Sequence, residues 1–373
     1  MKKIKVLHKV GLAIGGVEKY VFNNLTFINR DRFQFDVLTT NKEIINTEEY
    51  KKYHFGINYF SSSYSDNKEL FIKEISDIYE SGYDVIHLHT SKWTGFLLEE
   101  IAMEKKIPKV IVHSHSTGEL IPMNGSSSTD IHEKHKSLHE YYKTQFNERL
   151  ATDFCACSWS AANWLFGPQI PREKIRIMKN AINVEKFTFN EKVRKEVRNK
   201  LGIENRFVIG HVGRLSYEKN HEFLIDVFNE VYKRNNKARL LIIGNGKIED
   251  KIKRKIYEYA LDDVVLLLGW RDDVERIMQA MDLFLLPSLF EGLGIVLIEA
   301  QAAGLKCICS DRVPKEAAIT NNVEFIPLDI DKWADKVFKN SNDYDRENMY
   351  ECITNAGYNI KYSVKELEKL YEL

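Results

Sequence analysis

Two carboxylates bracket a glycine-containing loop in the second half of the chain. A strand pattern ends at Leu286, and an apolar helix pattern begins near Gly294. Glycine lets the backbone approach a ligand closely, and the first turn of a helix presents unpaired N–H groups and the positive end of its dipole. This combination predicts an anion site suited to a diphosphate. The segment runs Glu291, Gly292, Leu293, Gly294, Ile295, Val296, Leu297, Ile298, Glu299.

Glu291 precedes the predicted helix, where its carboxylate could reach sugar hydroxyls or a cationic transition state. Glu299 lies one to two turns into a helix that is otherwise apolar. The alternative stays open at this point: Glu299 could be a structural hydrogen-bonding residue and Glu291 an exposed loop residue.

Two cations occupy one predicted loop of the same half. Gly213 and Arg214 end a buried strand pattern, and Lys219 follows at the start of a helix. A lysine near a helix amino terminus opposes the helix dipole, which makes sense if the lysine has an anionic ligand. The pair could neutralise the two phosphates of a nucleoside diphosphate. We expect both to be loop-tip cations whose removal leaves folding nearly unaffected; a solvated pair without a ligand is the alternative.

Glycines and histidines form weaker signals in the first half. Gly15 and Gly16 open a helix after the first strand and could lie over a pyrophosphate, although their spacing is not that of a dinucleotide fingerprint. His113 and His115 end a predicted strand, so one of them could hydrogen-bond the transferred sugar or the acceptor. A core-edge role is equally open for them, and it is favoured for His87 and His89, which end the preceding strand.

Metal-binding patterns are weak. The Asp-x-Asp triplet Asp329–Ile330–Asp331 lies in a late segment, away from the loops that carry the other candidates. The cysteines lack the Cys-x-x-Cys spacing and the added histidines of a zinc site, and their odd number fits a reducing compartment. We expect no metal cofactor and buried, inert thiols at most of the five positions, which are Cys155, Cys157, Cys307, Cys309 and Cys352.

Strands that alternate with amphipathic helices position these residues. Such alternation predicts parallel sheets covered by helices. The predicted strands are 3–10, 33–39, 84–89, 109–113, 153–157, 207–213, 239–244, 264–268, 283–286 and 307–310. The predicted helices are 17–28, 68–79, 93–105, 221–233, 248–260, 274–281 and 295–303.

The fold class expected from this pattern is α/β, with two doubly wound Rossmann-like domains that face a central ligand cleft. We predict a first domain over residues 1–185 and a second domain over residues 186–357. Residues 190–205 are predicted as a polar junction.

The amino-acid composition limits the kinds of partner that this protein can bind. The chain has 373 residues, 44% hydrophobic and 29% charged, with a formal net charge of zero. No global field recruits nucleic acid or anionic lipid, and no apolar run approaches the roughly 20 residues of a spanning helix. The basic amino terminus turns polar again at His8 and Lys9, which favours a strand over a secretion signal. We therefore expect a cytoplasmic protein that is at most peripheral to a membrane.

The segment Thr129–Leu150 is the one candidate for membrane contact. Its apolar residues recur at three-, four- and seven-residue spacings and are flanked by lysines, as in a basic amphipathic helix at the bilayer surface. Ordinary packing of this stripe on the core of the first domain is the favoured alternative. The stripe consists of Ile131, Leu138, Tyr142 and Phe146.

Together these segments resemble the retaining GT-B glycosyltransferases of family 4, which include sucrose synthase-like enzymes, mannosyltransferases and bacterial capsule and exopolysaccharide enzymes. The resemblance covers essentially the whole chain. It implies that residues 1–185 form an acceptor-binding domain, that residues 186–357 form a nucleotide-sugar-binding domain, and that residues 358–373 form a helix that returns to the first domain. Gly15–Glu18 is similar to the family's Gly-Gly-x-Glu loop, and Gly213–Arg214 with Lys219 is similar to its diphosphate clamp. Glu291–Glu299 is similar to its Glu-x7-Glu element, the most specific of these motifs.

The resemblance implies a role for each candidate. Glu291 and His115 would be catalytic, with His113 open as the alternative histidine, and Glu299 would bind the ribose hydroxyls. Trp270 and Arg271 fall where the family holds the nucleotide base. Donor binding would further involve Gly15, Gly16, Arg214, Lys219, Gly244, Gly292, Leu293, Gly294, Ile295 and Val296.

Two features refine the resemblance. The His-Ser-His run at His113–His115 is typical of bacterial capsule and exopolysaccharide enzymes and favours UDP-hexose donors. Where the family has an acidic residue after a glycine-rich turn, this chain has Val313–Pro314–Lys315–Glu316, without the glycines.

The implied reaction moves a hexose from a UDP-sugar to a saccharide or lipid-linked saccharide acceptor, with retention of configuration and without a metal. Front-face attack is favoured over double displacement because no nucleophile is evident. A phosphorylase-type or epimerase-type reaction at the same pocket is a rival. A non-catalytic nucleotide-sugar-binding subunit of a glycosyltransferase complex is another, and it would bind UDP without releasing any from UDP-sugar.

Overall fold

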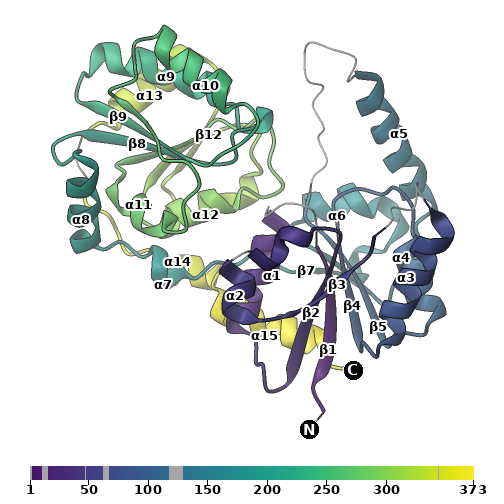
Figure 1. The fold of residues 1–373 in the computed structure, drawn as a ribbon. Helices are drawn as coiled ribbons and strands as arrows, with labels where there is room; N and C mark the ends of the chain where they lie inside the picture. The colour runs from purple at the N-terminus through teal and green to yellow at the C-terminus, as the bar shows by residue number, and fades with distance from the viewer. Residues whose placement is uncertain (1, 11–15, 47, 62–66, 117–128, 343) are drawn as a thin grey trace. The chain divides into compact units, whose positions relative to one another are not determined.

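The chain forms two compact units, Met1–Ala181 together with Ile360–Leu373, and Ile182–Asn359 (Figure 1). The computed structural model describes residues 2–10, 16–46, 48–61, 67–116, 129–342 and 344–373, and it describes no side chains for 43, 48, 49 and 129–136. The predicted first boundary, at 185/186, lies four residues after the observed one. The returning carboxyl-terminal segment belongs to the first unit.

A seven-stranded parallel sheet forms the centre of the first unit, in the order β3-β2-β1-β4-β5-β6-β7. Its strands are β1 (Ile4–Lys9), β2 (Phe33–Thr39), β3 (Gly56–Tyr59), β4 (Val85–Thr90), β5 (Lys109–Ser114), β6 (Asp153–Ala156) and β7 (Ile175–Ile177). Its helices are α1 (Gly16–Phe27), α2 (Glu48–Tyr53), α3 (Lys68–Glu80), α4 (Leu97–Glu104), α5 (Thr129–Gln145), α6 (Trp159–Leu165) and α15 (Ile360–Tyr371).

Strand alternation gives this sheet two apolar faces. On β1, Val6 packs with α1 and α15, while its neighbour Leu7 packs with α3, α4 and α6 on the other face (Figure 1). Near-continuous apolar strands are the rule for parallel sheets that helices cover on both sides. A polar side chain on either face must therefore find its partners within the protein.

The second unit has a six-stranded parallel sheet in the order β10-β9-β8-β11-β12-β13, the doubly wound Rossmann order. Its strands are β8 (Phe207–Val212), β9 (Ala238–Ile243), β10 (Val265–Leu267), β11 (Leu283–Leu286), β12 (Lys306–Ser310) and β13 (Val323–Ile326). Its helices are α7 (Val184–Phe187), α8 (Glu191–Leu201), α9 (His221–Arg234), α10 (Glu249–Glu258), α11 (Val274–Ala280), α12 (Ile295–Ala302), α13 (Ile330–Lys339) and α14 (Tyr350–Asn355).

The predicted α/β class with two doubly wound, Rossmann-like domains is confirmed, and the polar junction at 190–205 is wrong. Residues Glu191–Leu201 form α8, with Asn190 accepting a hydrogen bond from the Val193 N–H at one end and Gly202 in the left-handed conformation at the other. This helix is mostly charged, but Arg194 and Arg198 form ion pairs with Asp282. Tertiary pairing of these charges explains how so polar a segment becomes helical.

Three edge strands were also missed, namely β3, β7 and β13, each of three or four residues. The predicted helix 93–105 begins only at Leu97, because Gly95 has φ = 141°, which an α-helix cannot contain. Trp93 is part of the core, and its indole N–H donates to the Leu165 carbonyl. Cys155, Cys157, Cys307 and Cys309 are buried free thiols, as predicted, whereas Cys352 is exposed.

The described half of the α5 stripe packs into the core. Phe146 is buried and stacks on Trp93, and Tyr142 packs edge-on against Phe96. This packing favours the structural explanation for these two residues, while the side chains of 129–136 lie outside the described residues. Among the described residues, no helix is both long and apolar enough to cross a membrane.

Candidate active site

The loop between β11 and α12 carries the predicted anion site. Gly294 is the N-cap of α12 and has φ = 81°, in the left-handed region that glycine adopts without strain. Leu293 and Val296 are buried and anchor the loop on either side of it, while Gly292 and Ile295 are partly exposed. The helix therefore begins where the sequence predicted, with its first-turn N–H groups at the carboxyl end of the sheet.

Glu291 is held in place by two donors. Its Oε1 accepts from Lys219 Nζ at 2.5 Å and from Ser288 Oγ at 2.6 Å. The side chain of Glu291 is only 10% exposed and that of Lys219 only 17%. Lys219 is therefore a partly buried member of an ion pair, and the expectation that it is a loop-tip cation is wrong. Ser288 was missed by sequence reasoning.

Backbone and amide contacts tie the two loops together. The Leu289 N–H donates to the Glu218 carbonyl at 2.8 Å, and Asn220 Nδ2 donates to the Pro287 carbonyl at 3.2 Å. Asn220 itself is in the left-handed conformation between the short 3-10 turn Tyr217–Lys219 and α9. These contacts bring Lys219 to Glu291, although the two are 72 residues apart in sequence.

Arg214, in contrast, is exposed at the end of β8, as predicted. Its guanidinium has no ion-pair partner among the residues that the structure describes, so it is available to an anion. Gly244 lies beside this loop with φ = 140°, and a Cβ there would meet the Gly213 carbonyl oxygen at 2.0 Å. Close backbone approach thus requires glycine at 244, and donor contact by this residue stays a prediction.

Trp270 and Arg271, the residues predicted to bind the nucleotide base, lie in different environments. Trp270 is 56% exposed, whereas Arg271 donates twice to the carboxylate of Asp273, both at 2.7 Å. This pair lowers the pKa of Asp273. Arg271 and Asp273 border a cavity of about 290 Å³ with an apolar floor that includes Leu268 and Ile277. The cavity makes base binding here plausible in size, but contact with a base stays a prediction.

Glu299 lies in the second half of α12 and is partly buried. Its predicted ribose contact is neither supported nor opposed by the geometry. Gly15 lies outside the described residues. Gly16 is the first residue of α1, and a Cβ there would meet nothing within 4 Å, so crowding does not explain glycine at this position.

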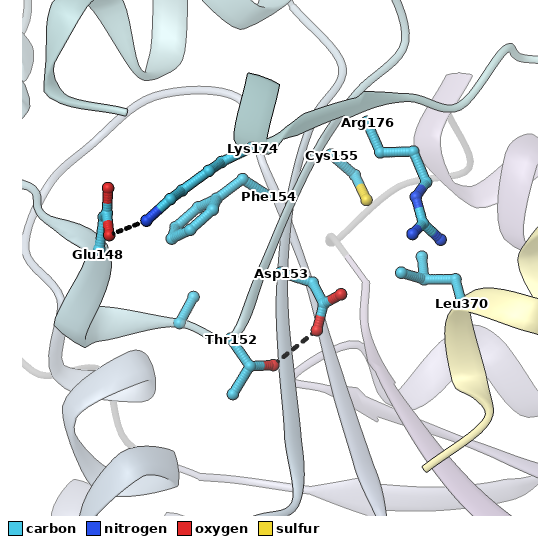
Figure 2. Close-up of a pocket in the computed structure, with 9 residues that line it drawn as sticks. Glu148, Thr152, Asp153, Phe154, Cys155, Lys174, Arg176 and Leu370 are labelled. Atoms are coloured by element: carbon cyan, nitrogen blue, oxygen red, sulfur yellow. Dashed lines mark hydrogen bonds and ion pairs between the residues drawn. The ribbon is translucent and has the colours of Figure 1, made fainter. Parts of the chain in front are cut away.

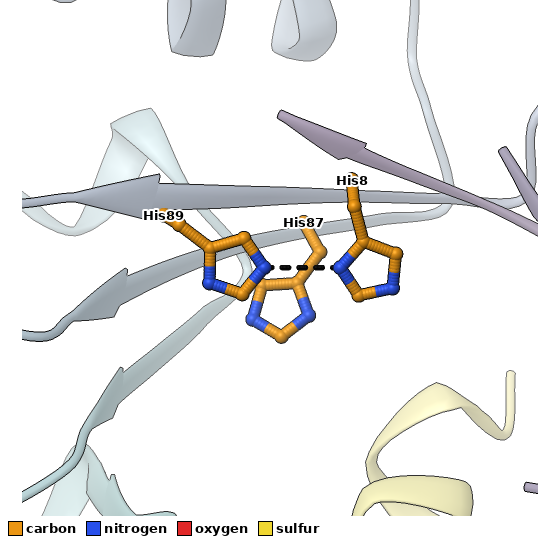
Figure 3. Close-up of side chains that lie close together, drawn as sticks. All are labelled: His8, His87 and His89. Atoms are coloured by element: carbon orange, nitrogen blue, oxygen red, sulfur yellow. Dashed lines mark hydrogen bonds between the residues drawn. The ribbon is translucent and has the colours of Figure 1, made fainter. Parts of the chain in front are cut away.

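Five imidazoles gather on one face of the first unit's sheet. His8 on β1 is in register with His87 on β4, and His89 on β4 is in register with His113 on β5. Because residues of equal parity share a face, these four lie together with His115 on the side that α1 and α15 cover. Figure 3 shows His8 and His89 joined by a hydrogen bond, with His87 beside them.

These histidines hydrogen-bond mainly to one another. The nitrogen pairs are His8 Nδ1 and His89 Nε2 at 3.0 Å, His89 Nδ1 and His115 Nε2 at 2.9 Å, and His87 Nε2 and His113 Nδ1 at 3.1 Å. Burial lowers the pKa of His8 and of His115 to about 3 and lowers those of the other three as well. All five are therefore neutral near pH 7.

The same nitrogens come close enough to suggest a metal. In two sets of three, the ligand atoms lie within 4.8 Å of one another: His8, His87 and His89, and His89, His113 and His115. In both sets, however, two of the facing nitrogens are already hydrogen-bonded to each other, and the rings of His87 and His89 stack rather than converge. The geometry favours a hydrogen-bonded network of neutral imidazoles.

A further pair of buried histidines lies in the second unit. His211 Nδ1 hydrogen-bonds the Leu285 carbonyl at 2.8 Å, and its ring meets that of His221 edge-on. Burial lowers the pKa of His211 to about 4. The hydrogen bond between His211 and Leu285 links β8 to the neighbouring strand β11.

Another cavity among the described residues lies in the first unit. About 320 Å³ in volume, it is lined by the start of β6, by Lys174 before β7 and by Leu370 of α15 (Figure 2). Lys174 pairs there with Glu148, and Thr152 donates to Asp153 at 2.8 Å. These residues sit at the amino ends of the strands, whereas ligands of doubly wound folds bind at the carboxyl ends. This cavity is not the candidate site.

Both halves of the chain match protein-family models. Residues 193–359 match the family described as glycosyl transferases group 1, and residues 14–186 match glycosyltransferase family 4. EpsF of Bacillus subtilis (strain 168), named as a glycosyltransferase, is 30% identical over 99% of this chain and 96% of its own length. The chain therefore belongs to the group 1 and family 4 glycosyltransferases.

Further similarities agree with this family. The UDP-Gal:alpha-D-GlcNAc-diphosphoundecaprenol alpha-1,3-galactosyltransferase of Escherichia coli is 29% identical over 78% of this chain and 75% of its own. Among solved structures, Alr3699/HepE of Anabaena in complex with UDP and glucose matches with a TM-score of 0.77 at 19% identity, over 99% of this chain and 100% of that one. At this identity the structural match establishes the GT-B fold.

The buried imidazoles make stability depend on pH. Below about pH 6.5 these histidines bind protons in the unfolded chain but stay neutral in the folded protein. The free energy of unfolding therefore falls as the pH decreases. Each imidazole contributes about 1.4 kcal/mol per pH unit in that range. Glu99, whose pKa burial raises to about 7, acts in the opposite direction and offsets one of them. We expect the free energy of unfolding to fall by several kcal/mol between about pH 6.5 and 5.5.

Denaturant titrations across this range measure the slope directly. The variant His54→Asn is the control, because His54 is exposed and lies outside the buried network. A free energy of unfolding that stays flat from about pH 7.5 to 5.5 would show that the five imidazoles are not held neutral.

Proposed function

We propose that this chain is a retaining, metal-independent glycosyltransferase that moves a hexose from a UDP-sugar to a saccharide or lipid-linked saccharide during surface polysaccharide synthesis. The observation that carries the proposal is the cluster of Lys219, Glu291 and Ser288 at the amino end of α12. It combines a fixed cation, a fixed carboxylate and the donor groups of a helix start in one loop pair. A diphosphate linked to a sugar needs these three kinds of group together.

In this proposal the donor diphosphate binds at the start of α12, where Lys219 and Arg214 contact its oxygens. A lysine ammonium has three N–H donors, so Lys219 can keep its bond to Glu291 and still donate to a phosphate oxygen. Arg214, exposed and able to bind two oxygens at once, supplies the second cation. As the bond from the anomeric carbon to the phosphate oxygen breaks, its electron pair passes to the departing diphosphate, whose growing charge these two cations stabilise.

Relatives favour a UDP-sugar and an acceptor at a membrane. The Escherichia coli relative is named for transfer from UDP-Gal to a diphosphoundecaprenol-linked sugar, and a Staphylococcus aureus relative, CapM, is named for capsular polysaccharide biosynthesis. Peripheral contact with the inner face of the membrane would bring this chain to such an acceptor. Slow hydrolysis of a panel of UDP- and GDP-sugars tests the donor without requiring the acceptor. A chain that binds UDP but hydrolyses no donor would be the non-catalytic subunit instead.

Removing Lys219 and removing Arg214 should have similar effects on catalysis but different effects on the free energy of unfolding. Arg214→Ala and Lys219→Ala should each cost on the order of 2–4 kcal/mol of transition-state stabilisation, as for a lost charge-stabilising donor. Lys219→Ala should also lower the free energy of unfolding by on the order of 1–3 kcal/mol, because it leaves the partly buried Glu291 without its cation. Arg214→Ala should not, since Arg214 is exposed.

Lys255→Ala is the matched control for this comparison. Lys255 pairs with Asp226 at 2.7 Å, and the two side chains are 19% and 22% exposed, much like the Lys219–Glu291 pair. Its loss should destabilise the protein without changing kcat. Wild-type turnover by Arg214→Ala or Lys219→Ala at saturating donor would remove the assigned role.

Fixed cations in place of a metal imply activity in the presence of a chelator. Asp329 of the Asp-x-Asp triplet is the N-cap of α13, and its side chain accepts a hydrogen bond from the Lys332 N–H. A second such triplet, Asp343–Tyr344–Asp345, begins at a residue outside the described ones. We expect donor hydrolysis to survive excess EDTA. Complete loss on chelation, restored by magnesium or manganese, would contradict the two-cation arrangement.

Retention follows if the acceptor attacks from the side on which the leaving group departs. The acceptor oxygen then bonds to the anomeric carbon, and its proton passes to an oxygen of the departing diphosphate, so no separate protein base is needed. An α-linked UDP-glucose or UDP-galactose should give an α-glycoside. Proton NMR of the product reports this through a small anomeric coupling, and a large coupling from a β-product would overturn the proposed mechanism.

A further inference from the structure

The five clustered histidines of the first unit and one tyrosine form a single series of hydrogen bonds that does not branch among the described residues. Tyr371, in the last turn of α15, joins the two halves: its hydroxyl lies 2.8 Å from His87 Nδ1 and 3.3 Å from His8 Nε2. With the three imidazole pairs described above, the order is His113, His87, Tyr371, His8, His89, His115. The two outermost nitrogens, His113 Nε2 and His115 Nδ1, are buried without a hydrogen bond among the described residues.

The number of protons limits this hydrogen-bonded series to three protonation states. Each neutral imidazole carries one N–H, and Tyr371, whose pKa burial raises well above its usual value, carries one O–H. Six protons serve five hydrogen bonds, so one proton is left over. It can sit at His115 Nδ1, at His113 Nε2, or on a Tyr371 hydroxyl that only accepts. The first state makes all five histidines Nδ1–H tautomers, and the second makes all five Nε2–H tautomers.

Three observations favour the surplus proton at His115. At His113 Nε2 an extra N–H would be buried without an acceptor among the described residues. At His115 the Asn180 side chain counteracts part of the lowering of the pKa that burial causes, the effect expected of an acceptor near an N–H. The third state would leave the Tyr371 hydroxyl proton buried and unpaired. Asn180 Oδ1 makes no well-formed hydrogen bond to any described residue, so it does not hold this proton firmly.

We propose that Tyr371 is a positioning residue that, through His8 and His89, fixes His115 as the Nδ1–H tautomer and so makes it a hydrogen-bond donor toward a sugar hydroxyl. This inference rests on the proposed function only in naming the sugar as the partner of His115. The direction of each hydrogen bond in the relay sets the direction of the next one. The Tyr371 hydroxyl on α15 therefore determines whether His115 or His113 carries the outermost N–H. The last turn of the carboxyl-terminal helix thereby controls a residue at the end of β5.

Removing the hydroxyl should break the relay without disturbing its packing. In Tyr371→Phe the ring keeps its edge contacts with Phe33 and Phe35. The network then splits into a pair and a triple, each with its own surplus proton, so the five histidines are no longer bound to one tautomer. Long-range proton–nitrogen correlation spectra of histidine-labelled protein distinguish the tautomers. We expect five Nδ1–H forms in the wild type and mixed forms at all five histidines in the variant.

The rate of UDP-sugar hydrolysis supplies the second measurement. Tyr371→Phe should lower kcat by about 2- to 10-fold, the worth of one neutral hydrogen bond, with little change in KM. Tyr79→Phe is the matched control: Tyr79 is equally buried, but its hydroxyl has no hydrogen bond among the described residues. That variant should leave both the tautomers and kcat unchanged.

The outcomes separate the inference from the proposed function. Mixed tautomers in the wild type, or identical spectra in Tyr371→Phe, would overturn the relay, and the wild-type spectrum decides even if the variant does not fold. If the tautomers shift as expected but neither Tyr371→Phe nor His115→Gln alters kcat, the relay stands and the role of His115 in the reaction is wrong. If wild-type protein hydrolyses no donor, the proposed function fails while the spectra still test the relay.

Discussion

A parallel sheet that helices cover on both faces leaves no water beside its strands, and the rest of this structure follows from that constraint. Polar side chains at the carboxyl ends of the strands must pair inside the protein, because an unpaired buried polar group costs on the order of 1–3 kcal/mol. Lys219 and Glu291 meet this demand with opposite charges. The histidines of β1, β4 and β5 meet it by remaining neutral and bonding to one another.

Under the proposed function, the two solutions suit two kinds of ligand. A diphosphate carries charge that increases during the reaction, so its site needs cations that are fixed before the ligand arrives. Glu291 fixes Lys219 and at the same time limits its net charge, so the cation is held without a large repulsive field around it. A sugar hydroxyl is neutral and both donates and accepts, so a neutral imidazole of defined tautomer is a sufficient partner. An imidazolium would be more costly to bury beside four others.

The sequence was enough to predict the fold class, the family and the position of most strands, because βα alternation and apolar runs are local signals. It also placed the start of α12 at Gly294, where glycine and the following apolar residues coincide. It failed for α8, whose charges are compensated by Asp282 some eighty residues away. It failed likewise for the Lys219–Glu291 pair, because the loop contacts that bring the two together leave no trace in the spacing of either motif.

The histidine network shows where sequence reasoning could have gone further. His87 and His89, like His113 and His115, are separated by one residue, which places each pair on one face of its strand. Neighbouring parallel strands with this spacing imply a histidine cluster once their adjacency is known, and β4 and β5 are consecutive. What no spacing reveals is Tyr371, which comes from the far end of the chain. Since α15 packs on the face where the imidazoles lie, the return of the carboxyl terminus to the first unit completes the relay as well as covering the sheet.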